Sequence, residues 1–403
     1  MTRFYLKKGR EESLRRFHPW VFSGAIGGVE GPDPAEGDAV AVCSAKGEVL
    51  GWGHYQIGSI AVRMLSFEDD MPAGGPDLPF WTQRLQRCLE ARRAFGLATH
   101  PATNCYRLVH GEGDNLPGLV IDWYDGVCVL QAHSAGMFHA RKDIAAALQA
   151  VYGGQLSAVY DKSAGTAPFK AGLDLGDGYL WQNGPSQALC PRTVLENGHK
   201  FLVDWENGQK TGFFLDQREN RALVERYARG RRVLNLFCYT GGFSVYALAG
   251  GALSVDSVDS SARAIDLVEQ NIALNFGPGA AHRVLCCDAI DFVKAAPKDA
   301  YDLMIVDPPA FAKHRGALSN ALRAYQRLNA AAIAAVAPGG LVFTFSCSQV
   351  VDREAFALAV FSAAAETGRR VRIIDRLCQP ADHAVNIYHP EGAYLKGLVL
   401  YVE

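Results

Sequence analysis

The chain has 403 residues, of which 49% are hydrophobic and 10% aromatic, and its 40 Lys and Arg against 42 Asp and Glu give a formal charge of −2. This length allows two or three domains, and this composition excludes a globally disordered chain. The balanced charge argues against a uniformly basic coat for nucleic acid. A local basic groove would still bind RNA, because affinity depends on where the cations lie.

Hydropathy and cysteine usage indicate the compartment. No run of about 18 consecutive apolar residues occurs, so we expect no membrane-spanning helix and no membrane partner. The charged N-terminus is followed by no apolar segment and does not resemble a secretory signal. The ten cysteines include no Cys-x-x-Cys spacing, which favours reduced, mostly buried thiols over a disulfide or zinc framework. We therefore expect a cytoplasmic protein without a metal site.

Residues 1–70 are predicted to form a small β-rich domain. It contains short apolar and β-branched runs separated by glycine signals, which is typical of strands, at 39–43, 48–55 and 59–65. The segment 67–79 combines Pro, Gly and acidic residues without any periodicity, so we expect a linker there.

Basic residues gather near the N-terminus, beside Phe17, His18 and Trp20. Cations interleaved with aromatic side chains can grip phosphates and stack on bases. The alternative is an ordinary solvated surface, because Glu11 and Glu12 offset part of the charge and Trp20 is expected in the core of the small domain. The candidate RNA-binding residues are Lys7, Lys8, Arg10, Arg15 and Arg16.

Residues 76–185 are predicted to form a mixed α/β domain. A helix over 81–95 would present one apolar face made of Trp81, Leu85, Cys88, Leu89 and Phe95.

A β-hairpin is predicted at Asp125-Gly126, because both central positions of such a turn need positive φ. Around it we expect strands at 118–124 and 127–133, a helix at 137–151 and a strand at 156–160. The Gly-rich stretch 161–200 has no clear period and is expected to contain strands that lead into the last domain.

From residue 190 to 403, short apolar strands alternate with amphipathic helices. This alternation predicts an α/β domain with a parallel, doubly wound, Rossmann-like sheet. The predicted strands are 232–237, 253–259, 282–288, 301–307 and 341–346, and the clearest helices are 261–275 and 317–336.

The first of these strands leads into a glycine pair, Gly241-Gly242, where the backbone could approach a ligand at a helix N-terminus. The next two strands end in Asp259 and Asp288, and an acid at the end of the second strand suits hydrogen bonds to ribose hydroxyls. The chain lacks both G-x-G-x-x-G and G-x-x-x-x-G-K-[ST]. A nucleoside without a phosphate chain therefore fits better, and we expect S-adenosylmethionine (SAM). On the alternative interpretation the glycines only turn the chain and the acids cap helices.

Two further motifs follow predicted strands, Asp307-Pro308-Pro309 and Ser346-Cys347-Ser348. Ligands of open α/β sheets bind at the carboxyl ends of the strands, so a carboxylate and a thiol are expected there together. The pair suits carbon methylation of a pyrimidine. A thiolate that adds to C6 of cytosine makes C5 nucleophilic, and a carboxyl group that shares a proton with ring N3 stabilises the adduct. The thiol needs a lowered pKa, which nearby helix N-termini could provide.

Other functions stay open on the residues alone. Cys347 could be a buried cysteine that acts as a small hydrophobe. Asp307 could merely shape a pocket in which the carbonyl groups of Pro308 and Pro309 accept an amine proton. That arrangement suits nitrogen methylation of an RNA base or a protein side chain, which needs no cysteine on the neighbouring strand. A third alternative is a non-catalytic RNA-binding protein with a degenerate cofactor fold.

Nearly end to end, the chain resembles class I SAM-dependent methyltransferases of the type that forms 5-methylcytosine in large-subunit (23S) ribosomal RNA. The motifs that carry the resemblance are HPWVFSGAI (18–26), RLVHGEGDNLPGLVIDWY (107–124), KTGFFLDQREN (210–220), NLFCYTGGFS (235–244), DPPAF (307–311), TFSCS (344–348) and ADHAV…PEGAYLKG (381–397).

The resemblance implies a PUA RNA-binding domain at 1–70, an EEHEE-like middle domain at 76–185 and a methyltransferase domain at 190–403. It also implies ribosomal RNA as the partner, leaves a homodimer open, and makes Cys347 the nucleophile with Asp307 beside it. Asp216 could at the same time be an ordinary helix N-cap. The implied SAM-binding residues are Phe214, Asp216, Gln217, Arg218, Asn235, Phe237, Tyr239, Thr240, Gly241, Gly242, Asp259, Ser260, Asp288, Ala289, Asp307 and Pro308.

Two comparisons within this resemblance sharpen the expected chemistry. Many RNA cytosine-C5 methyltransferases carry a second cysteine after the Pro-Pro pair, where this chain has Ala310, so the base that removes the C5 proton is unidentified. Related guanine methyltransferases share the FLD and DPP-type motifs but lack a cysteine at the position of Cys347. That cysteine favours cytosine over guanine.

Overall fold

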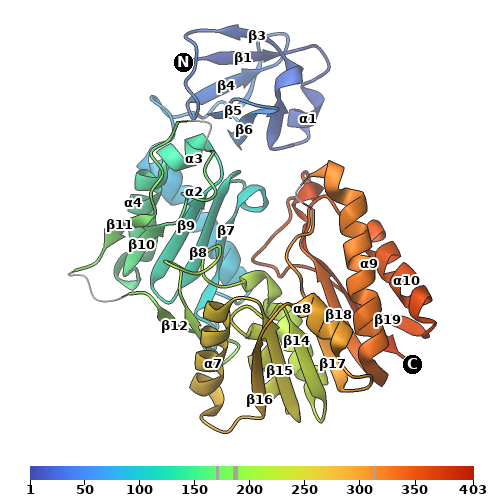
Figure 1. The fold of residues 1–403 in the computed structure, drawn as a ribbon. Helices are drawn as coiled ribbons and strands as arrows, with labels where there is room; N and C mark the ends of the chain where they lie inside the picture. The colour runs from blue at the N-terminus through green and yellow to red at the C-terminus, as the bar shows by residue number, and fades with distance from the viewer. Residues whose placement is uncertain (169–171, 185–188, 313) are drawn as a thin grey trace. The chain divides into compact units, whose positions relative to one another are not determined.

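The computed structural model describes residues 1–168, 172–184, 189–312 and 314–403. The chain divides into two compact units (Figure 1). The first comprises Met1–Val194, Val203–Leu215 and Ala381–Gly392, and the second Leu195–Leu202, Asp216–Pro380 and Ala393–Glu403. The ambiguous stretch 161–200 lies partly outside the described residues, at 169–171 and 185–188. In the described part of the chain, no helix combines the length and apolarity needed to cross a membrane.

The first unit begins with a six-stranded sheet in the order β2-β6-β5-β4-β1-β3. Its strands are β1 (Arg3–Leu6), β2 (Trp20–Phe22), β3 (Ile26–Glu30), β4 (Ala39–Cys43), β5 (Val49–Tyr55) and β6 (Ile60–Ser66), with the short helices α1 (Glu12–Arg15) and η1 (Ser23–Ala25). The three strands predicted in this region are confirmed as β4, β5 and β6.

The core of this sheet was predicted wrongly at one position. Its buried cluster includes Phe4, Val40, Val42 and Val62 but not Trp20. Trp20 is half-buried, and its indole Nε1 donates a hydrogen bond to Glu112 at 2.9 Å. The ring thus uses its polar edge in a contact distant in sequence, which the apolar pattern could not indicate.

A five-stranded sheet follows in the order β11-β10-β9-β8-β7. Its strands are β7 (Cys105–His110), β8 (Leu119–Tyr124), β9 (Val127–Ala132), β10 (Ala158–Asp161) and β11 (Gly178–Gln182). Its helices are α2 (Leu78–Ala94), α3 (Ala135–His139), α4 (Arg141–Tyr152), η2 (Gly111–Asp114) and η3 (Gly153–Gln155). The predicted hairpin turn is confirmed, with φ of 44° at Asp125 and 96° at Gly126.

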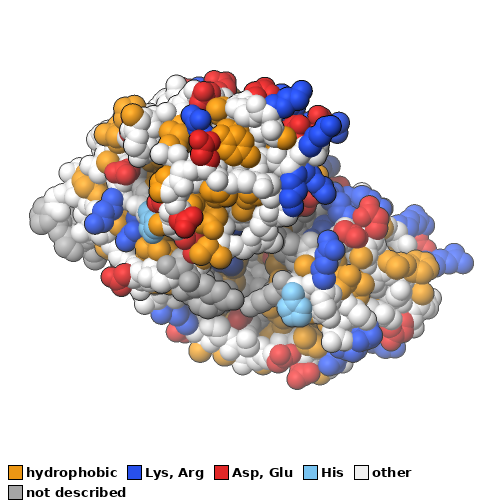
Figure 2. Space-filling view, turned by 90° about the horizontal axis from the view of Figure 1, so that it is seen from above, with side chains coloured by type: hydrophobic (Ala, Val, Ile, Leu, Met, Phe, Trp, Pro, Cys, Tyr) orange, Lys and Arg blue, Asp and Glu red, His pale blue; other side chains and the backbone are white. Residues whose placement is uncertain are grey.

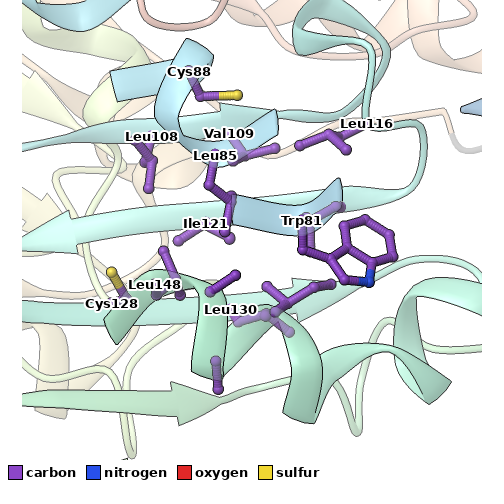
Figure 3. Packing of buried hydrophobic residues seen from close by; sticks show 14 of the residues in the cluster. Trp81, Leu85, Cys88, Leu108, Val109, Leu116, Ile121, Cys128, Leu130 and Leu148 are labelled. Carbon is purple, nitrogen blue, oxygen red and sulfur yellow. The ribbon is translucent and has the colours of Figure 1, made fainter. Parts of the chain in front are cut away.

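Helix α2 packs on this sheet through Trp81, Leu85, Cys88 and Leu89, as predicted (Figure 3). It begins where Asp77 accepts a hydrogen bond from the amide of Phe80. Two helix predictions need correction. Phe95 is the C-cap of α2 and is 50% exposed, because the helix ends before it can join the buried face. The helix predicted at 137–151 is two helices that meet at Ala140.

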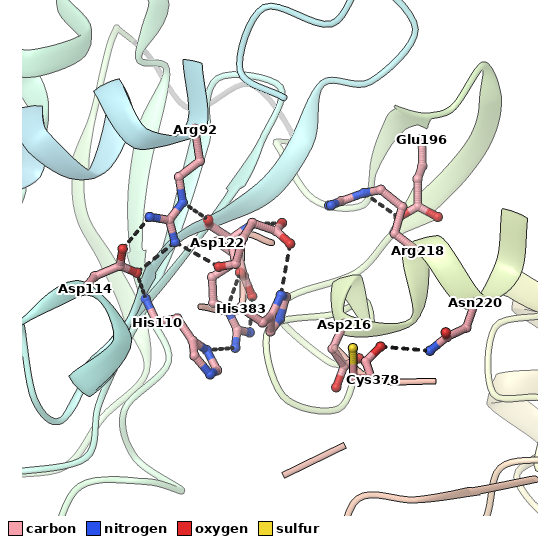
Figure 4. Close-up of polar contacts among 12 residues, drawn as sticks. Arg92, His110, Asp114, Asp122, Glu196, Asp216, Arg218, Asn220, Cys378 and His383 are labelled. Atoms are coloured by element: carbon pink, nitrogen blue, oxygen red, sulfur yellow. Dashed lines mark hydrogen bonds and ion pairs between the residues drawn. The ribbon is translucent and has the colours of Figure 1, made fainter. Parts of the chain in front are cut away.

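A buried ion pair attaches a segment distant in sequence to this sheet. Arg92 is fully buried and forms a bidentate pair with Asp114 (Figure 4). Its Nη2 also donates to the carbonyl of Asp382 at 2.8 Å, and the Asp382 carboxylate accepts the amide of Arg107 at 3.0 Å. The motif that begins at residue 381 is therefore held by charge-assisted hydrogen bonds in the first unit.

The second unit contains a seven-stranded sheet in the order β16-β15-β14-β17-β18-β20-β19. Its strands are β14 (Arg232–Leu236), β15 (Ser254–Asp259), β16 (His282–Cys286), β17 (Tyr301–Val306), β18 (Val336–Ser346), β19 (Val371–Leu377) and β20 (Lys396–Val402). Strands β14 to β18 pair in parallel, as predicted. Strand β20 runs antiparallel to both of its neighbours, β18 and β19. Strands β12 (Arg192–Glu196) and β13 (His199–Val203) form a separate two-stranded sheet.

Helices cover both faces of the large sheet. They are α5 (Arg218–Ala228), α6 (Gly242–Ala249), α7 (Ala262–Phe276), α8 (Ala289–Ala295), α9 (Leu318–Ala335) and α10 (Arg353–Thr367). The short turns η5 (Leu215–Gln217) and η6 (Arg315–Ala317) precede α5 and α9, and η7 (Pro390–Gly392) belongs to the first unit. Successive strand residues enter opposite clusters: Leu303 packs in the cluster with α5 and α6, and Met304 in the cluster with α8, α9 and α10. The sheet is therefore doubly wound, with apolar strands buried on both sides.

A buried carboxylate, Glu196, ties β12 to two helices of the second unit. Its two oxygens accept hydrogen bonds from Nε and Nη2 of Arg221, both at 2.8 Å. Tyr246 on α6 donates to the same carboxylate at 3.0 Å, and Arg218 Nε lies 3.4 Å from it (Figure 4). All these charged groups are buried, so loss of the one carboxylate would leave two guanidinium groups without it.

We predict that Glu196→Gln lowers the free energy of unfolding by about 3–5 kcal/mol, the typical cost of breaking a buried ion pair. Urea denaturation of the full chain measures the change. Glu219→Gln changes an exposed glutamate on α5, the helix that carries Arg218 and Arg221. It is the control and should change the free energy by less than about 0.5 kcal/mol. Equal unfolding midpoints for the two variants would contradict the prediction.

Candidate active site

The carboxyl ends of β14, β17 and β18 meet at one edge of the large sheet. In the parallel ladder Leu236 pairs with Val306, and Val306 pairs with Thr344. Asp307 follows β17 directly, and Cys347 follows β18 directly. The order of the strands reverses between β14 and β17, which is the switch point where open α/β sheets bind ligands.

Asp307 lies in an environment that disfavours its charge. Burial raises the pKa of this carboxyl group to about 7, with a further increase from the nearby Asp216 carboxylate. Gln217 Nε2 donates to Asp307 Oδ2 at 3.0 Å, and Asn220 Nδ2 in turn donates to Gln217 Oε1 at 2.6 Å. This chain of amides fixes the orientation of the carboxyl group. Near neutral pH the group is therefore able to carry a proton and donate it.

Asp216 contributes a second carboxylate to the same edge. Its Oδ2 accepts a hydrogen bond from the Tyr394 hydroxyl at 2.7 Å, whereas its Oδ1 is buried and has no hydrogen-bond partner among the described residues. The interpretation of Asp216 as a helix N-cap is wrong, because α5 begins with Gln217 as its N-cap and with no capping side chain. A buried carboxylate oxygen without a donor is unfavourable and suits a cationic ligand.

Cys347 is held in place by its two serine neighbours. Ser346 donates to the hydroxyl of Tyr325 on α9 at 3.0 Å, and Ser348 donates to the carbonyl of Ala312 at 2.7 Å. Burial raises the pKa of the Cys347 thiol to about 11, with further increases from Asp307 and Asp216. A hydrogen bond from the backbone and the charge of Lys396 lower this pKa, and a contribution from a helix N-terminus stays a prediction. The free protein therefore holds Cys347 mainly as a thiol.

The loop after β14 has the backbone of a ligand-binding turn. Phe237 and Tyr239 both adopt positive φ, at 57° and 48°, which is uncommon for bulky residues and marks a tightly constrained backbone. Gly241 has φ of 78°, and a Cβ atom there would lie 2.9 Å from the side chain of Val268. Only glycine fits this position, so the loop can turn closely before α6 begins at Gly242.

Polar residues at the end of β14 and in this loop have partners within the domain, although Asn235 Oδ1 is buried without a hydrogen-bond partner among the described residues. Asn235 is 1% exposed and donates to Ser244 at 2.8 Å, and the Thr240 carbonyl accepts from Asn271 at 2.8 Å. The Asp259 carboxylate accepts the amide of Tyr239 at 3.0 Å, which links the end of β15 to the loop. Cofactor contacts by these residues stay predictions.

The ends of β15 and β16 differ in how their acids are used. Asp259 also accepts the amide of Ser261, and Ser261 itself is the N-cap of α7. Asp288 caps α8 by accepting two backbone amides at 2.8 and 2.9 Å, so the helix-capping alternative holds for this residue. Ser260 is exposed and Ala289 is buried beside these acids in the chain.

Two of the predicted cofactor residues are placed differently from the rest. Arg218 is 2% exposed and lies in the Glu196 network, which gives it a structural role. Phe214 belongs to the first unit, so its contact with the cofactor stays a prediction. Pro308 is buried directly after Asp307.

The residues of the second unit fit SAM. The cofactor carries ribose hydroxyl groups, which suit the carboxylate of Asp259 at the end of β15. It also carries a positive sulfonium and a positive ammonium, which suit a site with two neighbouring carboxyl groups, Asp216 and Asp307. The unpartnered Oδ1 of Asp216 is the observation that most favours such a ligand.

Residues 106–387 match the family model described as S-adenosylmethionine-dependent methyltransferase, and residues 4–67 match a PUA-like domain. Ribosomal RNA large subunit methyltransferase I of Aeromonas hydrophila is 40% identical over 400 residues, which is 98% of each chain. The protein of that name from Escherichia coli is 39% identical over 399 residues, again 98% of each chain. The chain belongs to this family of SAM-dependent methyltransferases.

Solved structures agree with the fold of the family. SMU.776, crystallised in complex with SAH, superposes with a TM-score of 0.84 at 24% identity and full coverage of both chains. A protein from Streptococcus mutans described as a SAM-dependent methyltransferase gives 0.81 at 24% identity, also with full coverage. The protein thus has a PUA-like N-terminal domain and a Rossmann-like class I methyltransferase domain, and its cofactor is SAM.

The PUA-like domain of this family member carries a pocket of about 460 Å³ near the predicted RNA-binding residues. Arg10, His18, Trp20 and Phe22 are among the residues that line it. Figure 2 shows hydrophobic side chains exposed on the face of the first unit that includes this domain, with Lys and Arg side chains at its margin.

The five predicted cations are all exposed but are not equally available. Arg15 is ion-paired with Glu48, and Lys7 Nζ donates to the carbonyl of Gly24 at 2.9 Å. Lys8, Arg10 and Arg16 carry the remaining positive charge of this group. RNA contacts of all five stay predictions.

Sequence analysis missed several residues of the site. Tyr394 and Lys396 come from the segment after residue 393, whose motif was noticed without a role for either side chain. Tyr325 lies mid-helix, where nothing local marks it. Elsewhere in the described part of the chain, His18, His389 and Glu391 place possible metal-ligand atoms within 4.8 Å of one another, which their distance in sequence concealed. His389 Nδ1 lies 3.1 Å from Glu391 Oε2, and because burial lowers the pKa of His389 the two form an ion pair only when the imidazole is protonated.

We predict that Asp307 makes stability fall as pH rises from about 4 to about 7. The unfolded carboxyl group releases its proton near its ordinary pKa of about 3.9, whereas the folded one holds it to about 7, so the folded state binds more protons in that interval. Asp307→Asn, which resembles the protonated acid in shape, should flatten this slope. The measurement is the difference in unfolding free energy between the two proteins across pH 4–8. A difference that does not change with pH would contradict the raised pKa.

Proposed function

We propose that this methyltransferase forms 5-methylcytosine in large-subunit (23S) ribosomal RNA, in the cytoplasm, through a covalent bond between Cys347 Sγ and C6 of the target cytosine. One observation carries the proposal: a half-buried thiol and a carboxyl group with a pKa of about 7 follow adjacent parallel strands at the switch point. The curated relatives are named ribosomal RNA large subunit methyltransferase I, which supports the class of RNA.

The reaction needs a nucleophile because C5 of cytosine is too poor in electrons to take a methyl group by itself. The Cys347 thiolate would form a bond to C6, and the electrons of the C5–C6 double bond would move through the ring towards N3. Asp307, protonated near neutral pH, would donate its proton to N3 and so neutralise the developing charge. C5 then becomes enamine-like and nucleophilic.

SAM, when bound, supplies a methyl group on a positively charged sulfur. C5 would take this methyl group while the electrons of the carbon–sulfur bond stay on the cofactor sulfur, and the N3 proton would return to Asp307. A base would then remove the C5 proton. The electrons of the C5–H bond restore the double bond and expel the Cys347 thiolate. The carboxylates of Asp216 and Asp259 are proposed to orient the cofactor, because they are the acids at this edge with an unpartnered oxygen or a ribose-suited position.

RNA would reach the site through the PUA-like domain and by extrusion of the target base. A cytosine that undergoes chemistry at C5 and C6 must leave its stack to enter a pocket. The exposed cations Lys8, Arg10 and Arg16 and the exposed ring of Phe22 suit phosphate and base contacts near the domain pocket. The basic residues would position the RNA, and base pairing or shape would choose the nucleotide.

We predict that Cys347→Ala abolishes methyl transfer while SAM binding, measured by calorimetry, stays within about twofold of the wild type, because truncation removes the nucleophile and leaves the polar cofactor residues unchanged. Methyl transfer is measured as incorporation of labelled methyl groups into ribosomal RNA from cells that lack this gene. Cys286→Ala, an exposed cysteine on β16, is the matched control and should keep full activity.

An active Cys347→Ala variant would exclude the covalent mechanism. Mass spectrometry of the labelled nucleoside then distinguishes the alternative, since nitrogen methylation of an RNA base places the methyl group on a nitrogen and gives no 5-methylcytosine.

A further inference from the structure

Lys396, the first residue of β20, holds the chain on both sides of Cys347. Strands β18 and β20 pair antiparallel, and their register places Lys396 opposite Ser346, the residue before Cys347. The Lys396 Nζ atom donates a hydrogen bond of 2.6 Å to the carbonyl oxygen of Ser348, the residue after Cys347. A single residue therefore engages both neighbours of the nucleophile, Ser346 through the strand register and Ser348 through its side chain.

This lysine is buried as a charge without a carboxylate partner. Its exposed fraction is 4%, and no Asp or Glu among the described residues forms an ion pair with it. Burial lowers the pKa of Lys396 to about 8, Cys347 and Asp352 raise it, and Arg353 lowers it. An unpaired buried ammonium is unfavourable, so a buried lysine needs a nearby anion or gives up its proton.

The groups around Cys347 act on its thiol in opposite directions. Asp307, which follows β17, and Asp216 in η5 disfavour a thiolate at Cys347. A thiolate there would also raise the pKa of Tyr325 on α9. Lys396 from β20 is the positive charge that opposes them. The Cys347 thiol therefore needs a base to take its proton, and the Lys396 ammonium needs a nearby anion.

We propose that the ε-amino group of Lys396 accepts the thiol proton of Cys347 and holds the resulting thiolate as a buried ion pair. The S–H bond breaks, its electron pair stays on sulfur, and the proton forms a new N–H bond on Nζ. Lys396 is then a positioning residue, since it acts on the reaction through Cys347. The inference rests on the proposed function, because it concerns the nucleophile assigned there.

Three variants separate the charge of Lys396 from its hydrogen bond. Lys396→Gln can still donate to the Ser348 carbonyl but carries no charge and accepts no proton. Lys396→Met does neither, and Lys396→Arg keeps a positive charge. The probe is iodoacetamide, and the rate of alkylation of Cys347 in the full chain without RNA is followed from pH 6 to 10 by mass spectrometry of its peptide. The exposed Cys286 is the internal control in every sample.

We expect Lys396→Gln and Lys396→Met to raise the apparent pKa of Cys347 by at least about one unit, which slows alkylation about tenfold at pH 7, because the rate follows the thiolate fraction. Lys396→Arg should alkylate at least as fast as the wild type below pH 8. The rate at Cys286 should not change.

A Lys396→Gln profile identical to the wild type would overturn the proposal, since the hydrogen bond alone would then explain the residue. So would a Lys396→Arg variant as slow as Lys396→Gln. If Lys396→Gln fails to fold, judged by circular dichroism, Lys396→Met takes its place in both comparisons. The alkylation profile needs no methyl transfer, so a normal profile shift together with an active Cys347→Ala variant would refute the proposed function and leave the ion pair standing.

Discussion

The register of the parallel ladder through β14, β17 and β18 determines where the side chains of the site lie. Backbone hydrogen bonds pair Leu236 with Val306 and Val306 with Thr344, so three strands end at one edge, where the strand order also reverses. The ladder itself is held by apolar side chains that enter a cluster on each face. A shift by one residue in β18 would exchange the two faces and turn Cys347 away from Asp307. Core packing and catalytic geometry are therefore the same constraint.

The site concentrates groups that disfavour their own ionised forms. Burial keeps Asp307 protonated near neutral pH and keeps Cys347 as a thiol, and the two acids Asp216 and Asp307 repel each other's charge. Such an arrangement lowers the stability of the fold. The buried Glu196 network and the apolar clusters elsewhere in the unit offset this loss. It also suits a reaction in which a proton goes to the base ring while a thiolate forms nearby, since each group is poised close to its change of charge.

The parts that sequence could predict are those set by local periodicity and local turn chemistry. Strands β4, β5 and β6 follow from β-branched runs between glycines, and Asp125-Gly126 gives its hairpin because both residues need positive φ. The five parallel strands follow from their alternation with helices, and the polar residues at their ends follow from the rule that ligands bind there. The family motifs added roles that no spacing could supply.

What sequence could not predict depends on contacts between distant residues. Trp20 lies outside the core of its sheet because its indole N–H donates a hydrogen bond to Glu112. Arg218 lies beside the buried Glu196, a contact that its sequence neighbours do not indicate. Phe95 is exposed because α2 ends before it, and Asp216 caps nothing because the helix begins one residue later. Lys396 reaches Ser348 only because β20 inserts antiparallel next to β18, which a pattern of parallel strands does not foresee.

The central claim is a covalent Cys347–cytosine adduct, and RNA that carries 5-fluorocytidine tests it most directly. Fluorine at C5 leaves no proton for a base to remove, so the thiolate cannot be expelled after methyl transfer. We predict a protein–RNA complex that survives SDS, forms only with SAM present, and yields a crosslinked peptide in which the nucleotide is attached to Cys347. Methyl transfer to unmodified RNA by a preparation that gives no such complex, or a crosslink at another residue, would contradict the account.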